Sequence, residues 1–574
     1  MCGIHASVTR SGSVKLSPDL KQFLIDRGPD HLGQVHREVR GTATTSAALQ
    51  LGFTSTVLAL RGDHVARQPL ESQRSASVLC WNGEAWKIGG ELVDGNDGEV
   101  IVSKLPAEEP RLPDIQENQI LDLLRSIEGP FALVYFDAPT NRLYYGRDRL
   151  GRRSLLQFFG GTNAMQLASV ADVPTDEWEE VQADGIYVMN LGDIPKQEDT
   201  NNLRCYITRH DWIPNAAPGL LSNIGFLNAA LPQKDYRLDF DCISLGILRR
   251  RLEESLKLRV LNVPEPPNST SAVDIRIAIL FSGGLDCSIL ARLCHDLLPL
   301  SQGIDLINVA FENPRQVALA KAQPHLRAAD SYEACPDRAT GRQSFAELKT
   351  TCPGRLWRFI AVNVPFEEAM SHKPKISSLI HPHNTEMDLS IAFALYFAAR
   401  GIGDCYIGST EWEPEPRVAP TPARVLLSGL GADELFGGYA RHEVAFKRDN
   451  YRGLVEELRL DVGRIGQRNL GRDDRTMAHW GREVRFPYLD EEFVRFAIET
   501  PVWEKCDFQN PFHPAVIEPA KRLLRLLADQ LGLPKAARLK KKAIQFGSRT
   551  AKIESATGRL RGTATITASI PANH

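Results

Sequence analysis

The sequence predicts an α+β protein in two parts, with stacked antiparallel β-sheets first and a parallel α/β sheet flanked by helices after them. Short strand-like runs separated by Gly, Asn and Asp turns fill residues 1–195. From about residue 241, helical and strand-like segments alternate, as they do in parallel α/β sheets. A chain of 574 residues is also too long for one ordinary hydrophobic core.

The first part is marked by three strand-like runs. They are SASVLCWNG (75–83), GPFALVYFD (129–137) and DGIYVMNLG (184–192), and each contains or is bounded by turn residues. They predict antiparallel strands with few helices. Residues 196–240 lose this periodicity and gain Pro, Asn and Gln, which predicts a connector.

The second part begins with ISLGILRRRLEESLKLRV (243–260), whose apolar residues recur at helical spacing. The apolar run IRIAILF (275–281) predicts a strand, and the segment that follows it predicts a glycine turn leading into a helix. We expect this part to extend over 241–552. The small and polar residues of 553–574 predict a disordered tail.

Composition argues against several classes of partner. The formal net charge of −3 gives no reason to expect nucleic acid or an anionic membrane. The ten cysteines are scattered without a CxxC pair, which signals neither a zinc site nor a disulfide framework and fits a reducing compartment. No apolar stretch approaches the roughly 20 residues of a membrane helix. The sequence therefore predicts a soluble, cytoplasmic protein without nucleic-acid or membrane partners.

Cys2 directly follows the initiator methionine. If Met1 is removed, one residue carries both a thiol and a free α-amine, which titrates near about 7.7–8.0 and can accept the thiol proton. A single cysteine is more often an inert small hydrophobic residue. Other segments have to support the functional interpretation.

Two later segments supply that support. In WNGE (81–84), the side chain of Asn82 and the N–H of Gly83 could stabilise the oxyanion that forms when a thiolate attacks a carboxamide. In NDGEVI (96–101), Asp97 suits the ammonium group of an amino acid. Each string is also an ordinary turn, but their order behind Cys2 favours function.

A second set of residues predicts a phosphate site. SGGLD (282–286) joins a strand to a helix, so its backbone N–H groups and the helix dipole could hold phosphates. A plain strand-to-helix turn is the alternative, and the GxxxxGK[ST] pattern of a Walker A loop is absent. Asp433, in RVLLSGLGADELFGGY (424–439), could bind Mg²⁺ together with Asp286. Acidic residues at a helix start can also merely complement its dipole.

Taken together, these motifs resemble the glutamine-hydrolysing asparagine synthetase family, whose N-terminal part is a class II amidotransferase with an N-terminal nucleophile. RGPD (27–30) and GRDRLGRRSLL (146–156) extend the similarity. SGGLD resembles the PP-loop of ATP pyrophosphatases. The nearest likeness is to divergent asparagine synthetase domain-containing proteins, which have segments similar to PDRATGRQSFAELK (336–349) and IHPHNTEMDLSIAFALYFAARG (380–401).

The resemblance implies an Ntn-type sandwich over 1–195 and a PP-loop domain, like the adenine nucleotide α-hydrolases, over 241–552. It implies glutamine, aspartate and ATP as substrates, ATP and Mg²⁺ as cofactors, and asparagine, AMP and pyrophosphate as products; it is compatible with a homodimer. The implied catalytic residues are Cys2, Asn82, Gly83 and Lys542, with Lys541 as the alternative lysine. The implied ligand-binding residues are Asn82, Glu84 and Asp97 for glutamine; Leu280, Ser282, Gly283, Gly284, Asp286, Ser288, Val309, Ser428 and Gly429 for ATP; and Asp286 and Asp433 for the metal.

Three positions depart from the family pattern. Val57 stands where the family carries an arginine for the glutamine carboxylate, with Arg61 the nearest arginine, and Cys287 replaces a serine. Leu430 replaces a glutamate that serves the attack of ammonia, and a leucine cannot take a proton. Two alternatives therefore stay open: a non-catalytic relative that binds ATP, and an ATP-dependent amide-forming enzyme with another acceptor.

Overall fold

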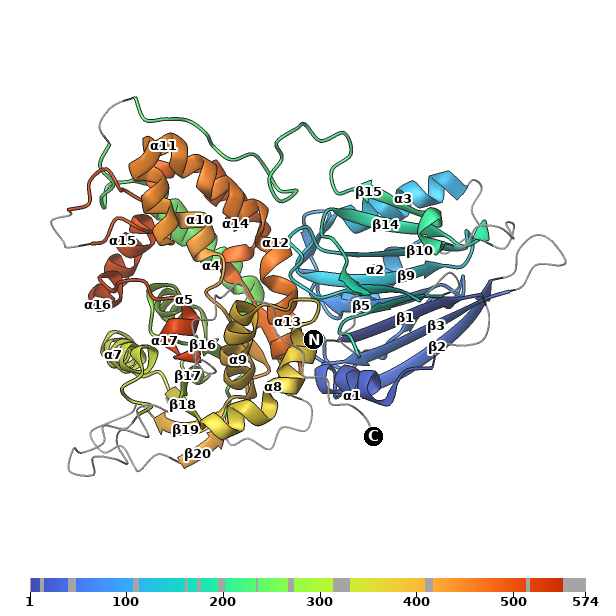
Figure 1. The fold of residues 1–574 in the computed structure, drawn as a ribbon, viewed down its shortest axis with the longest axis horizontal. Helices are drawn as coiled ribbons and strands as arrows, with labels where there is room; N and C mark the ends of the chain where they lie inside the picture. Colours follow the sequence, from blue (N-terminus) through green and yellow to red (C-terminus); the bar gives the residue numbers. More distant parts are fainter. Residues whose placement is uncertain are drawn as a thin grey trace.

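The computed structural model places the β-sheets of the first part beside a larger part that is rich in helices (Figure 1). The start of the chain is marked where the two parts meet. The predicted disordered tail, 553–574, lies outside the described residues. The structure describes residues 2–10, 15–39, 48–106, 113–160, 164–172, 177–194, 202–233, 236–266, 273–312, 331–407, 417–512 and 517–550.

Two six-stranded antiparallel sheets form the first part, with strand orders β13-β11-β12-β1-β3-β2 and β15-β14-β10-β9-β5-β4. Apolar side chains such as Ile4, Phe53 and Val134 pack between the sheets, so the predicted stacked antiparallel sheets are confirmed. The strands are β1 (Gly3–Thr9), β2 (His31–Val39), β3 (Leu49–Val57), β4 (Leu70–Glu71), β5 (Val78–Gly83), β9 (Phe131–Asp137), β10 (Arg142–Arg147), β11 (Leu156–Gly160), β12 (Ala164–Ala168), β13 (Trp178–Glu180), β14 (Gly185–Asn190) and β15 (Ile207–Asp211).

Helices cover these sheets. Leu20 and Leu24 of α1 (Pro18–Arg27) are buried against the first sheet, while α2 (Asp97–Lys104) and α3 (Pro113–Arg125) bury apolar residues against the second. Ser17 caps α1 and Asn96 caps α2 by accepting hydrogen bonds from backbone N–H groups of the first turn. A small sheet joins β6 (Lys87–Ile88), β7 (Glu91–Leu92) and β8 (Ile127–Glu128).

Strand β15 corrects the predicted connector of 196–240. Its residues pair with β14 from Gly185 opposite Asp211 to Met189 opposite Ile207, which extends the second sheet beyond residue 195. As an edge strand it has no buried residue, so its sequence carries none of the apolar alternation that reveals a strand.

The second part is built on a seven-stranded sheet with the order β20-β19-β18-β17-β16-β21-β22. Strands β18, β17, β16, β21 and β22 run parallel, as predicted, but β19 and β20 add an antiparallel edge. The strands are β16 (Ile277–Leu280), β17 (Ile304–Phe311), β18 (Trp357–Val364), β19 (Ile402–Ile407), β20 (Arg417–Pro420), β21 (Val425–Leu427) and β22 (Glu483–Arg485).

Helices pack around this sheet, and their apolar faces complete a large core. They are α4 (Ile243–Val260), α5 (Leu285–Leu297), α7 (Pro336–Thr351), α8 (Phe366–Ile380), α9 (Glu386–Arg400), α10 (Ala432–Phe436), α11 (Ala440–Gly463, kinked at Asp449 and Asn450), α12 (Ile465–Arg468), α13 (Leu470–Ala478), α14 (Glu491–Glu499), α15 (Arg522–Gln530), α16 (Pro534–Ala537) and α17 (Ile544–Gly547). Within the described ranges, no helix has both the length and the apolar character that a membrane crossing requires.

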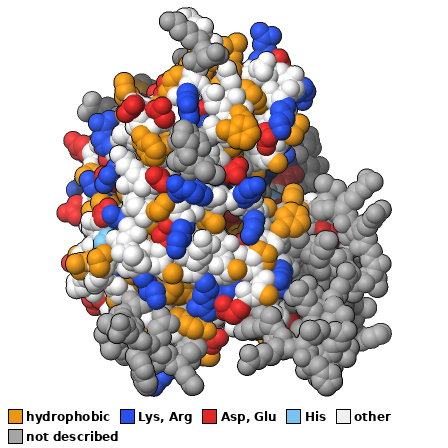
Figure 2. Space-filling model, turned by 90° about the vertical axis from the view of Figure 1, so that its left-hand side faces the viewer, with side chains coloured by type: hydrophobic (Ala, Val, Ile, Leu, Met, Phe, Trp, Pro, Cys, Tyr) orange, Lys and Arg blue, Asp and Glu red, His pale blue; other side chains and the backbone are white. Residues whose placement is uncertain are grey.

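Buried ion pairs join the two parts. Arg27 donates to Asp474 at 2.8 Å, and Arg475 donates to Glu180 at 2.7 Å. Breaking a buried pair leaves a charge without a partner in a poorly solvated place, so these contacts fix the two parts against each other. On the face of the helical part that Figure 2 shows, basic, acidic and apolar side chains are interspersed.

Candidate functional site

Cys2 lies at the start of β1, where both sheets of the first part converge. Its backbone N–H donates to Oδ1 of Asn82, on β5 of the opposite sheet, at 3.1 Å. Nε2 of Gln68 lies 3.7 Å from the Cys2 Sγ, and the Gln68 Oε1 accepts from the N–H of Trp81 at 2.9 Å. Burial raises the pKa of the thiol. A base close to Cys2 is therefore needed to make it a nucleophile.

Asn82 presents an unused donor at this thiol. The residue is fully buried, and its Nδ2 has no hydrogen-bond partner among the described residues. A buried amide N–H without a partner costs roughly 1–3 kcal/mol, which a bound oxyanion would offset. The predicted pairing of Asn82 with Cys2 is thus present in the geometry.

Close packing of the backbone explains why residue 83 is a glycine. A Cβ at this position would lie 2.3 Å from the carbonyl oxygen of Pro130, next to the paired strand β9. A larger residue would force the strands apart. The close approach explains the glycine without reference to catalysis.

The two predicted glutamine-binding acids are buried beside each other. Oδ2 of Asp97 accepts from Nε1 of Trp81 at 2.9 Å and from the N–H of Ala85 at 2.8 Å. Oε1 of Glu84 accepts from Nη2 of Arg485 at 2.9 Å. Burial raises the pKa of Asp97, and it raises the pKa of Glu84 to about 8. A cationic group of a ligand would stabilise the ionised form of both acids.

Arg61 supplies positive charge to this site. Its Nη1 lies 3.6 Å from Oε2 of Glu84, and its charge opposes the raised pKa of Asp97. Val57 is buried at the end of β3. Arg61, four residues after Val57, is therefore an arginine that lies beside the predicted glutamine-binding acids.

The second site is a cavity of about 760 Å³ at the carboxyl ends of β16, β17 and β21. Ligands of parallel α/β sheets bind at this end of the strands, and the volume lies within the range of about 300–1,000 Å³ for small-molecule pockets. The predicted ATP residues that line the cavity are Leu280, Ser282, Gly284, Asp286, Val309, Ser428 and Gly429.

The other two predicted ATP residues support the glycine turn. Gly283 has φ +77°, and a Cβ there would lie 2.5 Å from the backbone of Gly341 in α7. Ser344 of α7 donates to the Gly283 carbonyl at 2.6 Å, and Ser288 lies 3.5 Å from the same carbonyl. The turn is therefore held by α7. Helix α5 begins directly after Gly284 without a side-chain cap, which leaves first-turn N–H groups for an anion.

An ammonium group bridges the two predicted metal ligands. Nζ of Lys521 lies 2.8 and 2.9 Å from the carboxylate oxygens of Asp286 and 2.8 Å from Oδ1 of Asp433. Burial raises the pKa of Asp286. In Asp433 the lysine charges of Lys521 and Lys541 outweigh burial and hold the pKa well below its usual range.

This arrangement fits a metal that is shared between two carboxylates. One cation already reaches both acids, so they lie close enough to share another. Within the described part of the chain, no group of three or more His, Cys, Asp or Glu residues is placed to hold a metal. Mg²⁺ commonly takes one or two carboxylates together with water and substrate phosphates.

Of the two predicted catalytic lysines, Lys541 is the one that contacts the acidic pair, through Asp433. It contacts Oδ2 of Asp433, and its Nζ lies 4.1 Å from the ring centre of Tyr439. Lys542 is exposed and makes no such contact. Both lysines line the cavity, and the choice of Lys542 as the catalytic lysine stays a prediction, with Lys541 closer to Asp433. Lys521 carried no sequence signal, because its acidic partner Asp286 lies 235 residues away.

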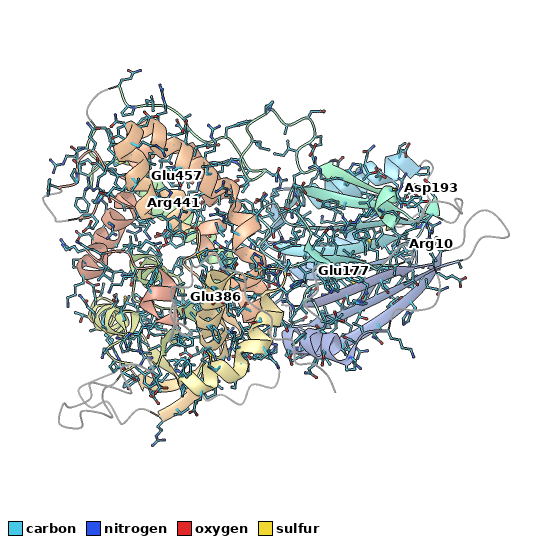
Figure 3. The ribbon with its side chains drawn as sticks, in the orientation of Figure 1. Arg10, Glu177, Asp193, Glu386, Arg441 and Glu457 are labelled. Atoms are coloured by element: carbon cyan, nitrogen blue, oxygen red, sulfur yellow. The ribbon has the colours of Figure 1, made fainter. Side chains whose placement is uncertain are left out.

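A further wall of the cavity combines charged and apolar residues. Nη1 of Arg472 donates to Asp388 at 2.6 Å, and Leu430 lines the cavity together with Met387 and Ile391. Arg441 also lines it and points toward Glu457, with 3.4 Å between Nε and Oε1 (Figure 3). The cavity lining therefore includes apolar residues as well as the leucine at position 430.

Comparison with known proteins places the chain in a family. The family model for asparagine synthase matches residues 447–566. Asparagine synthetase domain-containing protein 1 of Bos taurus is 33% identical over 96% of both chains. Asparagine synthetase domain-containing protein YML096W of Saccharomyces cerevisiae is 31% identical over 92% of this chain and 88% of its own. Asparagine synthetase [glutamine-hydrolyzing] 1 of the same yeast is 23% identical, covering 93% and 82%. The chain belongs to the family of asparagine synthetase domain-containing proteins.

Proposed function

We propose that the protein is a glutamine-dependent asparagine synthase. The observation that carries this proposal is a direct link between the two sites through Arg485. Its side chain holds Glu84 beside the thiol site at 2.9 Å, and its carbonyl accepts the N–H of Ser428, in the cavity, at 3.0 Å. Ammonia release and carboxylate activation are the two reactions that such a pair of sites would couple.

The first reaction uses Cys2. Removal of Met1 turns the nitrogen that now donates to Asn82 into an α-amine, which takes the thiol proton. The thiolate attacks the carboxamide carbon of glutamine, and Nδ2 of Asn82 donates to the oxyanion. The carbon–nitrogen bond breaks, ammonia leaves with the proton, and water hydrolyses the glutamyl thioester.

Charged groups around Cys2 select the substrate. Asp97 and Glu84 are buried acids that attract the α-ammonium group of glutamine, and Arg61 faces its α-carboxylate. A free amino acid satisfies both signs of charge. A peptide-linked glutamine lacks both charges and would gain none of these interactions.

The second reaction takes place in the cavity. The glycine turn and the start of α5 bind the phosphates of ATP, while Leu280 and Val309 line the adenosine end. Asp286 and Asp433 would hold Mg²⁺, and when bound this ion would neutralise charge on the departing pyrophosphate. The aspartate side-chain carboxylate attacks the α-phosphorus, and Lys541 stabilises charge there. Ammonia then attacks the acyl carbon, the bond to AMP breaks, and the nitrogen loses one proton to water, which forms asparagine.

One observation favours a second candidate, an amide-forming enzyme with another acceptor. Leu430 cannot accept a proton, and it lines the cavity with other apolar residues such as Met387 and Ile391, which suit a carboxylate substrate with an apolar body better than they suit aspartate. In that case adenylation would persist and asparagine would not form.

The test is to incubate the purified full chain, with Met1 removal checked by mass spectrometry, with Mg-ATP, aspartate and either glutamine or ammonium. Asparagine and pyrophosphate are quantified together. We expect asparagine from both nitrogen sources and, in Cys2→Ala, from ammonium alone. Pyrophosphate formed with a different carboxylic acid, without asparagine, would replace the proposal by the second candidate. If neither product forms under any of these conditions, the result would favour the alternative of a non-catalytic protein.

A further inference from the structure

Asp337 is a buried carboxylate to which no described residue donates a hydrogen bond. It lies in the first turn of α7, is 7% exposed and lines the cavity of the second site. Among the described residues, no group donates a hydrogen bond to its oxygens, although its backbone carbonyl accepts from Nδ2 of Asn308 at 3.0 Å. Buried acceptors are normally paired, so the free carboxylate points to a ligand that brings donors.

The neighbouring chain is shaped around this carboxylate. A Cβ at Gly547 would lie 2.0 Å from Oδ1 and 2.3 Å from Oδ2 of Asp337, so only glycine fits there. Burial raises the pKa of Asp337 to about 7, and the charge of Lys542 opposes this shift. The carboxylate is thus enclosed on the protein side and open toward the cavity.

The position of Asp337 along α7 indicates which part of a bound nucleotide it would contact. Gly341, one helical turn further on, packs against Gly283 of the glycine turn. Four residues of helix rise about 6 Å, so Asp337 lies one turn beyond the contact with the phosphate-binding segment. In a nucleotide, the group directly attached to the α-phosphate is the ribose. The exocyclic amino group of adenine lies at the far end of the base.

We propose that the carboxylate of Asp337 accepts hydrogen bonds from the 2′- and 3′-hydroxyls of the bound nucleotide. A carboxylate has two acceptor oxygens and a ribose has two adjacent hydroxyl donors, a pairing that other nucleotide-binding folds also use. The cavity thereby distinguishes ribonucleotides from deoxyribonucleotides. This inference rests on the proposed use of ATP by the second site.

The experiment measures binding of Mg-ATP, Mg-2′,3′-dideoxy-ATP and Mg-ITP to the full chain by titration calorimetry, independently of turnover. Loss of two hydrogen bonds to a charged acceptor should weaken dideoxy-ATP binding roughly 10- to 100-fold in the wild type. In Asp337→Asn, which keeps the side-chain shape, ATP affinity should fall and the preference for ATP over dideoxy-ATP should shrink to a few-fold. The preference for ATP over ITP should not change.

Two controls separate the possible results. Asp337→Glu keeps the charge and should retain part of the ribose preference, whereas Asp296→Asn removes an acid of α5 that is paired with Arg292 and should leave the preference as in the wild type. Equal wild-type affinity for ATP and dideoxy-ATP overturns the ribose contact alone. Loss of the ATP-over-ITP preference in Asp337→Asn shows that the residue reads the base and also overturns it. A wild type that binds none of the nucleotides overturns both the proposed function and this inference.

Discussion

Replacing Lys521 by methionine removes the ammonium group that bridges Asp286 and Asp433 and keeps a side chain of similar length. Lys521 is 4% exposed and lies within 2.9 Å of three carboxylate oxygens. Asp433 keeps its contact with Lys541, so Asp286 is the acid that loses its cation. Removing one member of a buried pair leaves the other charge poorly solvated, at a cost of about 3–5 kcal/mol in the free energy of unfolding.

A divalent cation should restore much of this loss. The two carboxylates of the variant face each other with one positive charge fewer, so Mg²⁺ should bind them more tightly than in the wild type. Binding to the folded state stabilises it by mass action. We therefore expect Mg²⁺ to raise the unfolding midpoint of Lys521→Met more than that of the wild type.

The assay is denaturant unfolding of the full chain, with and without millimolar Mg²⁺. Lys540→Ala is the matched control, because this lysine is 84% exposed and lies 4.0 Å from Glu518. It should change stability by less than about 0.5 kcal/mol. A Lys521→Met protein as stable as the wild type, or one indifferent to Mg²⁺, would refute the reasoning that the two acids form one shared cation site.

Three further predictions concern other parts of the molecule. Asn82→Ala should lower kcat for glutamine hydrolysis by about 10²–10³, because an oxyanion donor is lost. Asparagine formation from ammonium should stay unchanged. Assays with both nitrogen sources check this, and equal losses of the two activities would contradict it. Lys541→Ala should abolish aspartate-dependent pyrophosphate release and Lys542→Ala should reduce it only slightly; the reverse order would identify Lys542 as the catalytic lysine. Burial lowers the pKa of His479 from 6.5 to about 4. The folded protein therefore loses about 3 kcal/mol of its free energy of unfolding through this residue as the pH falls from 6.5 toward 4, and none of it above pH 6.5. In denaturant unfolding measured at several pH values, His479→Phe should lose less stability between pH 6.5 and pH 4 than the wild type. An equal loss would exclude the histidine as its source.

The sequence predicted the parts of the site that lie in contiguous segments. Cys2, Asn82 and Asp97 each stand in a short string whose chemistry can be recognised, and the structure brings them together at one end of the stacked sheets. The glycine turn at Gly283 was visible for the same reason. A strand, a turn and a helix start follow one another along the chain.

Other features depend on contacts between distant segments. Lys521 meets Asp286 across 235 residues, and Arg485 meets Glu84 across 401, so no local pattern reveals either pair. The choice between Lys541 and Lys542 depends on which side chain the backbone turns inward. The sequence alone cannot show this orientation, because the two adjacent residues are of the same type.

The contact between Arg485 and Glu84 has a practical consequence for anyone who wishes to express the thiol-bearing half alone. Truncation in the 212–240 segment would remove β22, which lies in the other half, and with it the guanidinium group of Arg485 that donates to Glu84. The same truncation would separate Arg152 from Glu491 and Arg27 from Asp474. The isolated half would therefore expose several orphaned charges on its freshly uncovered face, and its glutamine affinity would not represent that of the whole chain.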